Sequence, residues 1–528
     1  MADAAADSFY LTTAIFYPSP GPPLHSLFEA IGADAIVRYH RLLGEDVRFQ
    51  TGMDEHSAQV ELLARQRETS PRELVDAWAD AWRTGFDRFD ISYDRFIRTT
   101  DPDHVRASIE MVTRAQAAGD IYKGTYAGWY CPGDNEFKTE AQIVDGHCPD
   151  HPTLELQWLE EENYFFALSR YQERLEQLYR DNPSFCEPEH FRNEVLGWMK
   201  EGLRDFSVSR AGGSWGIPFP GDPEHRIYVW FDALTNYLTG AGFPDDPAAF
   251  ARYWPADVHI IGKNITRFHC LYWPAMLMSA GIALPDQVFA HGFMLLRGEK
   301  MSKTRGNVLD PDAAVDLFGV DGVRYLVLRE IPFDRDGDVT LEGLVRRYNA
   351  DLANDLGNLV NRTISMATRY LDGHLPPLAD DGAEADAELR SAATTAVSGY
   401  HDAMRRFHLD EALAAMNTLV RAGNGYAESQ APWSLHKQGE TERLGQVLAA
   451  MAETCRILGH LVAPFTPASA ARLHDQLGVP PPYDRRGSGG PGLEALLAWG
   501  AVGAGWSVGA AEPLFPRTEL PAEVEAGP

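Results

Sequence analysis

The sequence is poor in cysteine, in long apolar runs and in positive charge, and each shortage excludes a class of protein. Its 528 residues contain five widely scattered cysteines, which argues against a disulfide framework. No segment approaches the roughly 18 consecutive apolar residues of a membrane span. The first residues also lack the basic segment and apolar run of a secretory signal. The sequence therefore predicts a cytoplasmic protein with no membrane partner.

The shortage of positive charge bears on nucleic-acid binding. With 47 Lys and Arg against 76 Asp and Glu, the formal net charge is −29. Phosphate contacts need Lys and Arg to displace counterions, so this balance argues against a nucleic acid as partner. Net charge still leaves room for a local basic face, and particular residues have to decide the question.

A strand–helix–strand pattern opens the chain, and strand-like runs recur shortly before residue 300. Residues 8–17 are rich in β-branched and aromatic side chains and end in a proline-rich turn. Apolar residues then recur with helical spacing over 24–43, and 46–52 has the composition of a second strand. Further strand-like runs occupy 258–262 and 288–291. This pattern predicts a parallel α/β sheet, which binds ligands at the carboxyl ends of its strands.

The composition changes along the chain in a way that predicts several domains. The length exceeds what one compact core usually holds. Residues 119–225 bear Gly, Pro and Cys and have the texture of an insertion, and from residue 351 the apolar period becomes that of a helix bundle. After residue 479 a Pro- and Gly-rich stretch is typical of a linker.

Two lysines suggest a mobile clamp on polyphosphate. Lys300 and Lys303 stand three residues apart on a segment with Gly298 and Gly306 at its ends. Two ammonium groups on a hinged segment suit the charge of a phosphate chain. Taken alone, the same five residues also fit a solvated basic turn.

The surroundings of this segment resemble the second signature of methionyl-tRNA synthetases. The matching runs are 291–294, 300–304 and 306–311, and further long matches occur at 202–210, 215–218 and 230–237. The resemblance extends from Phe9 to at least Trp433, and 512–517 resembles that family's closing segment. Agreement over so many separate segments is far more specific than any one motif.

The resemblance implies a fold and a domain order. The expected fold is an α/β Rossmann-type class I synthetase catalytic domain with an inserted connective domain, followed by an all-α anticodon-binding helix bundle. The expected ranges are 1–118 and 225–325 for the two catalytic halves, 119–224 for the insertion, 326–350 for a linking stem-contact region, 351–479 for the bundle and 480–528 for a C-terminal linker and tail. The family's optional C-terminal dimerisation domain has no counterpart, which predicts a monomer.

The resemblance also implies an activity, the ATP- and Mg²⁺-dependent activation of methionine and its transfer to tRNA(Met). The family's methionine pocket matches residue by residue at Ile15, Tyr17, Asp54, Trp230, Ala233, Tyr237, Ile265, Phe268 and His269. Aromatic rings and a small alanine can surround a thioether, and Asp54 can pair with the α-ammonium group. The alternative, an ordinary aromatic core, fits any one of these residues but not the whole set.

The ATP-handling residues implied by the resemblance are only partly present. Residues matching the second signature are Lys300, Lys303, His291, Gly292 and Met294. The first signature departs from the family, because Pro23-Leu24-His25-Ser26 stand where two histidines are expected. Losing one such donor typically costs about 10²–10³ in rate. His25 either substitutes as a catalytic group or is a surface histidine, and Asn264 replaces the family's usual acidic residue.

A zinc knuckle is implied in the insertion. Cys131, Asp134, Cys148 and His151 match its ligand positions, with Asp134 in place of a cysteine. All four are ligand types that zinc accepts. The alternative is that these residues are a remnant that packs without metal.

Residues matching the family's anticodon readers are present in the helical region. Asn354, Asn358 and Arg362 are spaced to share one helix face, and Trp433 follows Ala431-Pro432. Amide and guanidinium groups can bond base edges while an indole stacks on an unpaired base. The alternative is polar capping residues and a core tryptophan.

Two rival functions remain at this stage. One is a tRNA-independent paralogue that activates an amino acid and hands it to a small hydroxylamine or amine, which the altered first signature and the acidic charge favour. The other is a non-catalytic tRNA-binding protein, which would explain the missing histidines but not the surviving clamp and methionine pocket.

Overall fold

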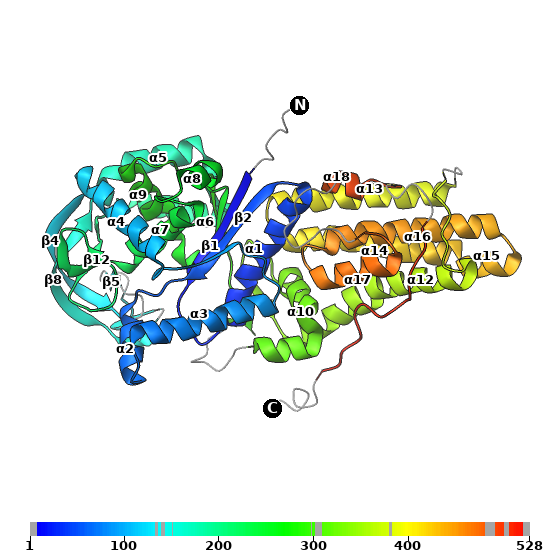
Figure 1. The fold of residues 1–528 in the computed structure, drawn as a ribbon, viewed down its shortest axis with the longest axis horizontal. Coiled ribbons are helices and arrows are strands. Elements are labelled where there is room, and N and C mark those ends of the chain that lie inside the picture. Colours follow the sequence, from blue (N-terminus) through cyan, green and yellow to red (C-terminus); the bar gives the residue numbers. More distant parts are fainter. Residues whose placement is uncertain are drawn as a thin grey trace.

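The computed structural model describes residues 8–132, 136–138, 143–149, 151–296, 298–300, 309–379, 383–480, 492–500 and 506–520. It has an α/β part that contains the N-terminal half and a long helical part that extends to one side (Figure 1). Within the described ranges, none of the helices combines the length and the apolar character needed to cross a membrane.

The α/β part is built on a six-stranded sheet in which every neighbouring pair is parallel. The strand order is β3-β2-β1-β14-β15-β9. The bounds are β1 Ser8–Phe16, β2 Asp46–Met53, β3 Arg95–Arg98, β9 Cys186–Glu187, β14 Val258–Gly262 and β15 Gln287–His291. Their side chains are mostly buried, as expected for a sheet covered on both faces.

Helix α1 (Leu24–Leu43) crosses from β1 to β2 and coincides with the helix that the apolar spacing predicted. Pro23 stands just before it, and Gly44 ends it in the left-handed conformation, φ 90°. Almost the whole helix is buried, because it packs on the sheet and on α10 (Pro311–Glu330). Only its first turn opens toward the carboxyl ends of the strands.

Helices α2 (Ala58–Gln66), α3 (Pro71–Arg88) and α4 (Pro102–Ala117) complete the first half of the sheet's covering. An antiparallel sheet, β10-β8-β4-β5, follows, with β4 Ile121–Cys131, β5 Glu136–Lys138, β8 Gln157–Phe166 and β10 Phe206–Ser207. A second antiparallel sheet joins β11 Ser209–Ala211, β13 Asp222–Ile227 and β12 Pro218–Phe219. Helices α5 (Gln172–Asp181), α6 (Glu189–Lys200), α7 (Val229–Ala241), α8 (Pro247–Tyr253) and α9 (Trp273–Ala280) pack around them.

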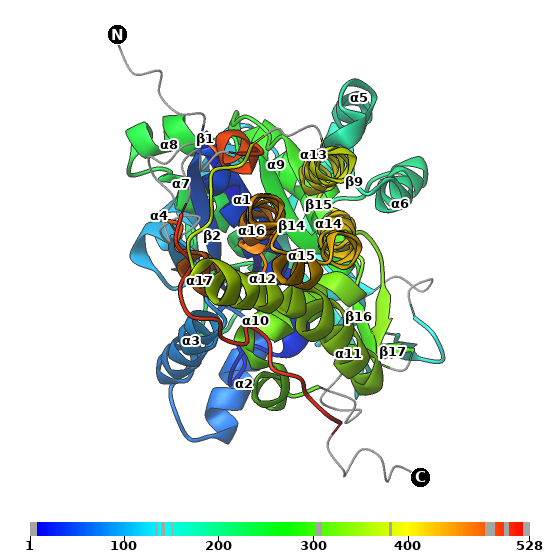
Figure 2. The ribbon, with the colours of Figure 1, turned by 90° about the vertical axis from the view of Figure 1, so that its right-hand side faces the viewer.

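The helical part is a bundle that is seen end-on in Figure 2. A π-helical segment (Tyr348–Leu356) connects α11 (Leu341–Arg347) to its first long helix. The helices are α12 Gly357–Leu371, α13 Glu384–Arg405, α14 Leu409–Gln430, α15 Pro432–Gln438, α16 Thr441–Val462, α17 Pro467–Leu477 and the short α18 Leu493–Leu497. Residues 506–520 then run back along the bundle, with Leu514 and Phe515 buried.

One buried ion pair joins the two parts. Asp34 of α1 accepts hydrogen bonds from Arg38 (2.6 Å) and Arg324 of α10 (2.7 Å). Arg324 also donates to the backbone oxygens of Pro464 and Phe465 in the bundle. Although burial alone would raise it, these guanidinium groups lower the pKa of Asp34 to about 2. The carboxylate is therefore ionised throughout the physiological range.

Replacing Arg324 with leucine should destabilise the protein severely. Asp34 and Arg324 are both fully buried, and breaking a buried pair by removing one partner typically costs about 3–5 kcal/mol. Urea unfolding should show this loss, whereas Arg180→Gln, which alters an exposed arginine on α5, should leave the midpoint nearly unchanged. Equal midpoints for the two variants would contradict the role given to the pair.

Two buried histidines touch in the bundle. The rings of His460 (α16) and His474 (α17) lie 4.5 Å apart, centroid to centroid. Burial lowers the pKa of His460 to about 2 and that of His474 to about 4, so both are neutral at pH 7. Gly459 allows this approach, since a Cβ there would lie 2.3 Å from His474 Nε2.

Stability should therefore fall as the pH drops below about 6.5. In that range the unfolded histidines bind protons and the folded ones do not, so each contributes a loss of about 1.4 kcal/mol per pH unit until its folded pKa is reached. Thermal unfolding between pH 7 and 4.5 should show a shallower decline for His460→Phe than for the parent. His436→Gln, an exposed histidine of α15, serves as the control, and parallel curves for all three proteins would refute the assignment.

Candidate active site

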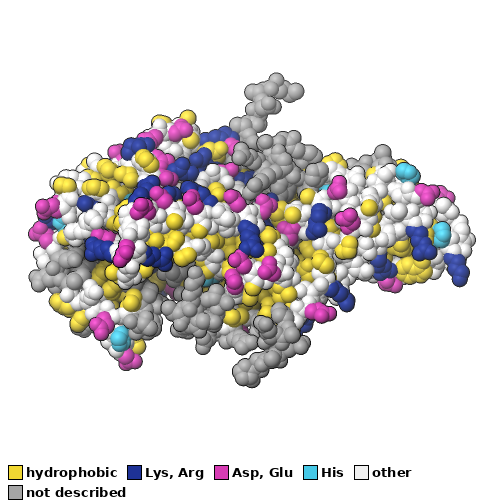
Figure 3. Space-filling model, turned by 60° about the horizontal axis from the view of Figure 1, so that its bottom comes forward, with side chains coloured by type: hydrophobic (Ala, Val, Ile, Leu, Met, Phe, Trp, Pro, Cys, Tyr) yellow, Lys and Arg dark blue, Asp and Glu magenta, His cyan; other side chains and the backbone are white. Residues whose placement is uncertain are grey.

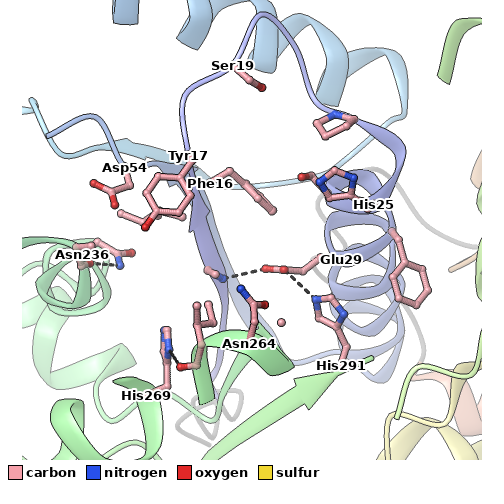
Figure 4. Close-up of a pocket in the computed structure, with 18 of the residues that line it drawn as sticks. Phe16, Tyr17, Ser19, His25, Glu29, Asp54, Asn236, Asn264, His269 and His291 are labelled. Atoms are coloured by element: carbon pink, nitrogen blue, oxygen red, sulfur yellow. Dashed lines mark hydrogen bonds and ion pairs between the residues drawn. The ribbon is translucent and has the colours of Figure 1, made fainter. Parts of the chain in front are cut away.

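A pocket of about 410 Å³ lies where the carboxyl ends of β1, β14 and β15 meet the start of α1 (Figure 4). Most residues that the sequence singled out line it: Ile15, Tyr17, His25, Asp54, Trp230, Ala233, Tyr237, Ile265, His269, His291, Gly292 and Met294, together with Asn264. Phe268 stands behind this lining and stacks on Trp230 at 3.7 Å between ring centroids. The pocket is thus a product of segments far apart in the chain.

The carboxyl group of Asp54 faces one end of the pocket. It is almost fully buried, and its Oδ1 has no hydrogen-bond partner within the described part of the chain. Burial, with nearby Asp232 and Glu55, holds the pKa of Asp54 well above its usual range. A buried carboxyl group without a partner is costly, so a cationic ligand at this place would lower its free energy.

Asp232 behind it has the opposite environment. His56 Nδ1 and His104 Nε2 lie 2.7 and 2.6 Å from its two oxygens. Although burial alone would raise it, these imidazoles hold the pKa of Asp232 below its ordinary value. The pKa values of these two neighbouring aspartates are thus shifted in opposite directions, because two imidazoles bind Asp232 while burial dominates at Asp54.

The aromatic wall of the pocket is fixed by a hydrogen-bonded chain. His269 Nδ1 lies 3.0 Å from the oxygen of Ile265, which can only accept, so that nitrogen carries the proton. Its Nε2 then accepts from the hydroxyl of Tyr237 at 2.6 Å. Burial lowers the pKa of His269 to about 4, which keeps the ring neutral. The wall offers rings and a neutral imidazole to an apolar ligand.

At the other end of the pocket, Glu29 of α1 organises a site that the sequence reasoning missed. Its oxygens accept from the backbone N–H of Ala14 (3.0 Å) and from His291 Nε2 (2.9 Å). His291 Nδ1 lies 2.8 Å from the oxygen of Gly292, so both ring nitrogens face hydrogen-bond acceptors. The sequence feature that could have predicted this site is a glutamate within the otherwise apolar run of 27–31.

The altered first signature stands at the start of α1, directly after a loop that is fastened to α3. Trp82 Nε1 donates to the backbone oxygen of Ser19 (3.0 Å) and to its hydroxyl (3.3 Å), and its ring stacks on Phe16. Gly85 permits contact with Pro22, since a Cβ there would lie 2.5 Å from the proline ring. His25 is exposed in the first turn of α1 and lines the pocket beside this loop.

The lysine segment is only partly described. Lys300 belongs to β17 (Glu299–Lys300), which pairs with β16 (Met294–Leu296), and β16 also pairs with β18 (Gly337–Val339). This small sheet extends from the pocket residue Met294. The side chain of Lys300 and the whole of Lys303 lie outside the described residues.

The predicted anticodon residues fall in two places on the bundle. Asn354 lies in the π-helical segment and accepts two hydrogen bonds from Arg517, and with Asn358 it lines a polar cavity of about 510 Å³. Arg362 instead pairs with Glu428 (2.7 Å) and lies 5.5 Å from the ring centroid of Trp433, which is 39% exposed. The tryptophan is therefore not the core residue of the alternative reading.

The predicted zinc ligands are tested little by the structure. Cys131 and Cys148 are buried in the insertion. Asp134 and the side chain of His151 lie outside the described residues. Among the residues that are described, no three His, Cys, Asp or Glu side chains gather as a metal site.

The architecture and this pocket define a class I aminoacyl-tRNA synthetase, and comparisons with known proteins agree. The family model for class I (M) tRNA synthetases matches residues 9–157 and 153–364. That for the anticodon-binding domain of methionyl tRNA ligase matches 376–515. The predicted fold class, including the all-α anticodon-binding bundle, is confirmed.

Individual relatives give the particular family. The chain is 43% identical to a methionine–tRNA ligase of Caldanaerobacter subterraneus over 98% of this chain and 80% of that one. It is 44% identical to one of Brucella suis over 97% and 98%. A structure of Mycobacterium tuberculosis methionyl-tRNA synthetase in complex with methionyl-adenylate matches with a TM-score of 0.90 and 43% identity, over 97% of this chain and 100% of that one. The chain belongs to the methionyl-tRNA synthetase family.

Replacing Trp82 with phenylalanine should impair the handling of ATP and spare that of methionine. The variant keeps a ring against Phe16 but loses both hydrogen bonds to Ser19, and one such bond is worth about 1 kcal/mol, or roughly fivefold. In ATP–pyrophosphate exchange, KM for ATP should rise or kcat fall by that order while KM for methionine stays constant. Trp78→Phe on the same helix is the control, and an equal change in both KM values would contradict the proposal.

Proposed function

We propose that this protein is an ATP-dependent methionine–tRNA ligase that forms methionyl-adenylate and transfers methionine to tRNA(Met). The observation that carries this proposal is the polarity of the pocket, with Asp54 at one end, the Glu29–His291 pair at the other and an aromatic wall between them. Family membership over nearly the whole chain supports it. The small-acceptor alternative has no comparable support.

In the first step Asp54, as a carboxylate, pairs with the α-ammonium group of methionine, and Trp230 and Tyr237 contact the thioether. A carboxylate oxygen of methionine attacks the α-phosphorus of ATP, and the bond from that phosphorus to the bridging oxygen breaks to release pyrophosphate. The apolar side chains exclude water, which strengthens each charge–charge interaction. The residue roles are proposals that rest on position in the pocket.

The missing first-signature histidines call for other positive partial charges near the α-phosphate. The first N–H groups of α1 lie at this end of the pocket, and a helix N-terminus favours anions. We assign His291, held by Glu29, and the lysine segment of 300–303 to the same task. His25 at the rim is the nearest replacement for a lost imidazole. Mg²⁺ would accompany ATP as its phosphate counterion.

In the second step the terminal ribose hydroxyl of tRNA attacks the carbonyl carbon of the adenylate, and AMP leaves with the electron pair of the broken bond. We propose that Arg362 and Trp433 read the anticodon, together with Asn358 on the helix of Arg362 and Asn354 in the π-helical segment before it. Lys and Arg side chains, interleaved with acidic ones, occur toward the end of the bundle that is distant from the α/β part (Figure 3). Local positive charge is therefore present although the net charge of the whole chain is negative. Zinc in the insertion, a monomeric state and a cytoplasmic location remain predictions.

The direct test is methionine-dependent ATP–pyrophosphate exchange paired with charging of tRNA(Met). We expect both activities. Exchange without charging would favour a small-molecule acceptor, and the absence of exchange would refute amino-acid activation itself. Charging of initiator and elongator tRNA should be measured separately, because both carry the methionine anticodon.

Replacing Asp54 with asparagine should raise KM for methionine roughly 10²-fold, because a charge-assisted hydrogen bond worth about 1.5–3 kcal/mol is lost in a buried site. KM for ATP should change little. Since burial raises the pKa of Asp54, the parent should lose kcat/KM for methionine as the pH falls and the carboxylate is protonated. The asparagine variant should lack this pH dependence. Asp80→Asn, an exposed residue of α3, is the control, and an unchanged KM in Asp54→Asn would disprove the assignment.

A further inference from the structure

A second cavity, of about 200 Å³, lies beside the active site. It is formed by the start of α2, the β11–β13 sheet and Tyr130 of β4. Pockets that enclose a whole small ligand usually measure about 300–1,000 Å³. This one is smaller and open to one side, so it suits one unit of a longer ligand. We call it the acceptor groove.

The wall between the acceptor groove and the active site is one or two residues thick. Asp54 lines the active site, whereas His56, two residues later, lines the groove. Likewise, Trp230 lines the active site and its neighbour Val229 lines the groove. The groove therefore adjoins the methionine end of the pocket. His25 and His291 mark the nucleotide end, which lies at the opposite end of the pocket from Asp54 and Tyr17 (Figure 4).

The charge of the acceptor groove suits a phosphate. Among the described residues no carboxylate pairs with Arg226, whose Nη1 donates only to the backbone oxygens of Pro223 (2.8 Å) and His225 (3.2 Å). The guanidinium of Arg210 lies nearby, 4.2 Å from the ring centroid of Tyr228. The carboxylate of Glu61 is already paired with Arg65. Arginine is the side chain best suited to bind a phosphate group.

The remaining lining suits an unpaired base. Trp215 is held by a hydrogen bond from Nε1 to the oxygen of Glu55 (2.7 Å) and by edge contact with His56. Gly212 and Gly213 have φ of 72° and 78°, and no atom lies within 4 Å of where a Cβ would stand on either. A fixed indole that lines the same cavity as this open space at two glycines offers a surface on which a base can stack.

We propose that the acceptor groove binds an unpaired nucleotide at the 3′ end of tRNA, with Arg226 on a phosphate and a base against Trp215. The proposal rests on the ligase function, because the 3′ hydroxyl must reach the carbonyl carbon of methionyl-adenylate. AMP fills the nucleotide end of the pocket at that moment, so the acceptor approaches from the methionine end. The acceptor groove adjoins this end.

The kinetic test compares Arg226→Gln with Arg180→Gln, an exposed arginine of α5, in the full-length protein. For Arg226→Gln, KM for tRNA in charging should rise about five- to tenfold, and the slope of log KM against log salt should fall by about one. ATP–pyrophosphate exchange should stay within twofold of the parent, which separates this residue from the activation step. Arg180→Gln should match the parent in both assays. A loss of exchange equal to the loss of charging would overturn the proposal.

A binding cycle decides the proposal even if no tRNA is charged. Dissociation constants are measured for intact tRNA(Met) and for tRNA(Met) lacking its three 3′-terminal nucleotides, with a non-hydrolysable methionyl-adenylate analogue present. Truncation should weaken binding to the parent and have little further effect on Arg226→Gln, because the two changes remove one interaction. If intact and truncated tRNA bind the parent equally, the acceptor groove does not hold the 3′ end. Additive losses would likewise refute it, and either result leaves the ligase proposal standing on its own assays.

Discussion

The buried pair of Asp34 and Arg324 sets the geometry on which the other sites depend. Asp34 lies on α1, the same helix that carries His25 and Glu29 into the pocket, and Arg324 binds the backbone oxygens of Pro464 and Phe465 in the bundle. Taking two charges out of water is expensive unless every remaining hydrogen-bonding position is satisfied. Here Ser92 supplies two more donors to Asp34, and Phe89 one more acceptor to Arg324. A displaced bundle would deprive the buried Arg324 of the backbone oxygens of Pro464 and Phe465, so this contact helps to fix the orientation of the two parts.

Two neighbouring aspartates of the active site differ in their hydrogen-bond partners and therefore in their pKa values. Asp54 and Asp232 lie close enough to influence each other, yet the first has a raised and the second a lowered pKa. The difference arises because His56 and His104 bind Asp232, whereas no cationic side chain among the described residues forms an ion pair with Asp54. Neighbouring titratable groups whose pKa values are shifted in opposite directions are typical of functional sites. The end of the pocket that we assign to methionine therefore needs no contribution from the first signature.

The sequence predicted those features that are local or periodic. Helix α1, the strands of the parallel sheet and the lining of the pocket follow from spacing and from matching residues. Contacts between distant segments did not follow from it. Trp82 and Ser19 are 63 residues apart, and Arg517 reaches Asn354 across 163, where no period links them. The π-helical turn at Tyr348–Leu356 also departs from the spacing that placed Asn354 and Asn358 on one regular helix face.

The effect of the altered first signature depends on the loop before α1, whose conformation is restricted. The loop before α1 contains four prolines, is fastened by Trp82 and packs on Gly85, so its conformation is restricted before ATP binds. A restricted loop fixes the first turn of α1, and donors that need no reorganisation act most strongly on developing charge. Both lost imidazoles belonged to this turn, whereas Glu29 and His291 lie on α1 and β15 and do not depend on it. We therefore expect the substitution to affect the rate of adenylate formation more than the recognition of methionine.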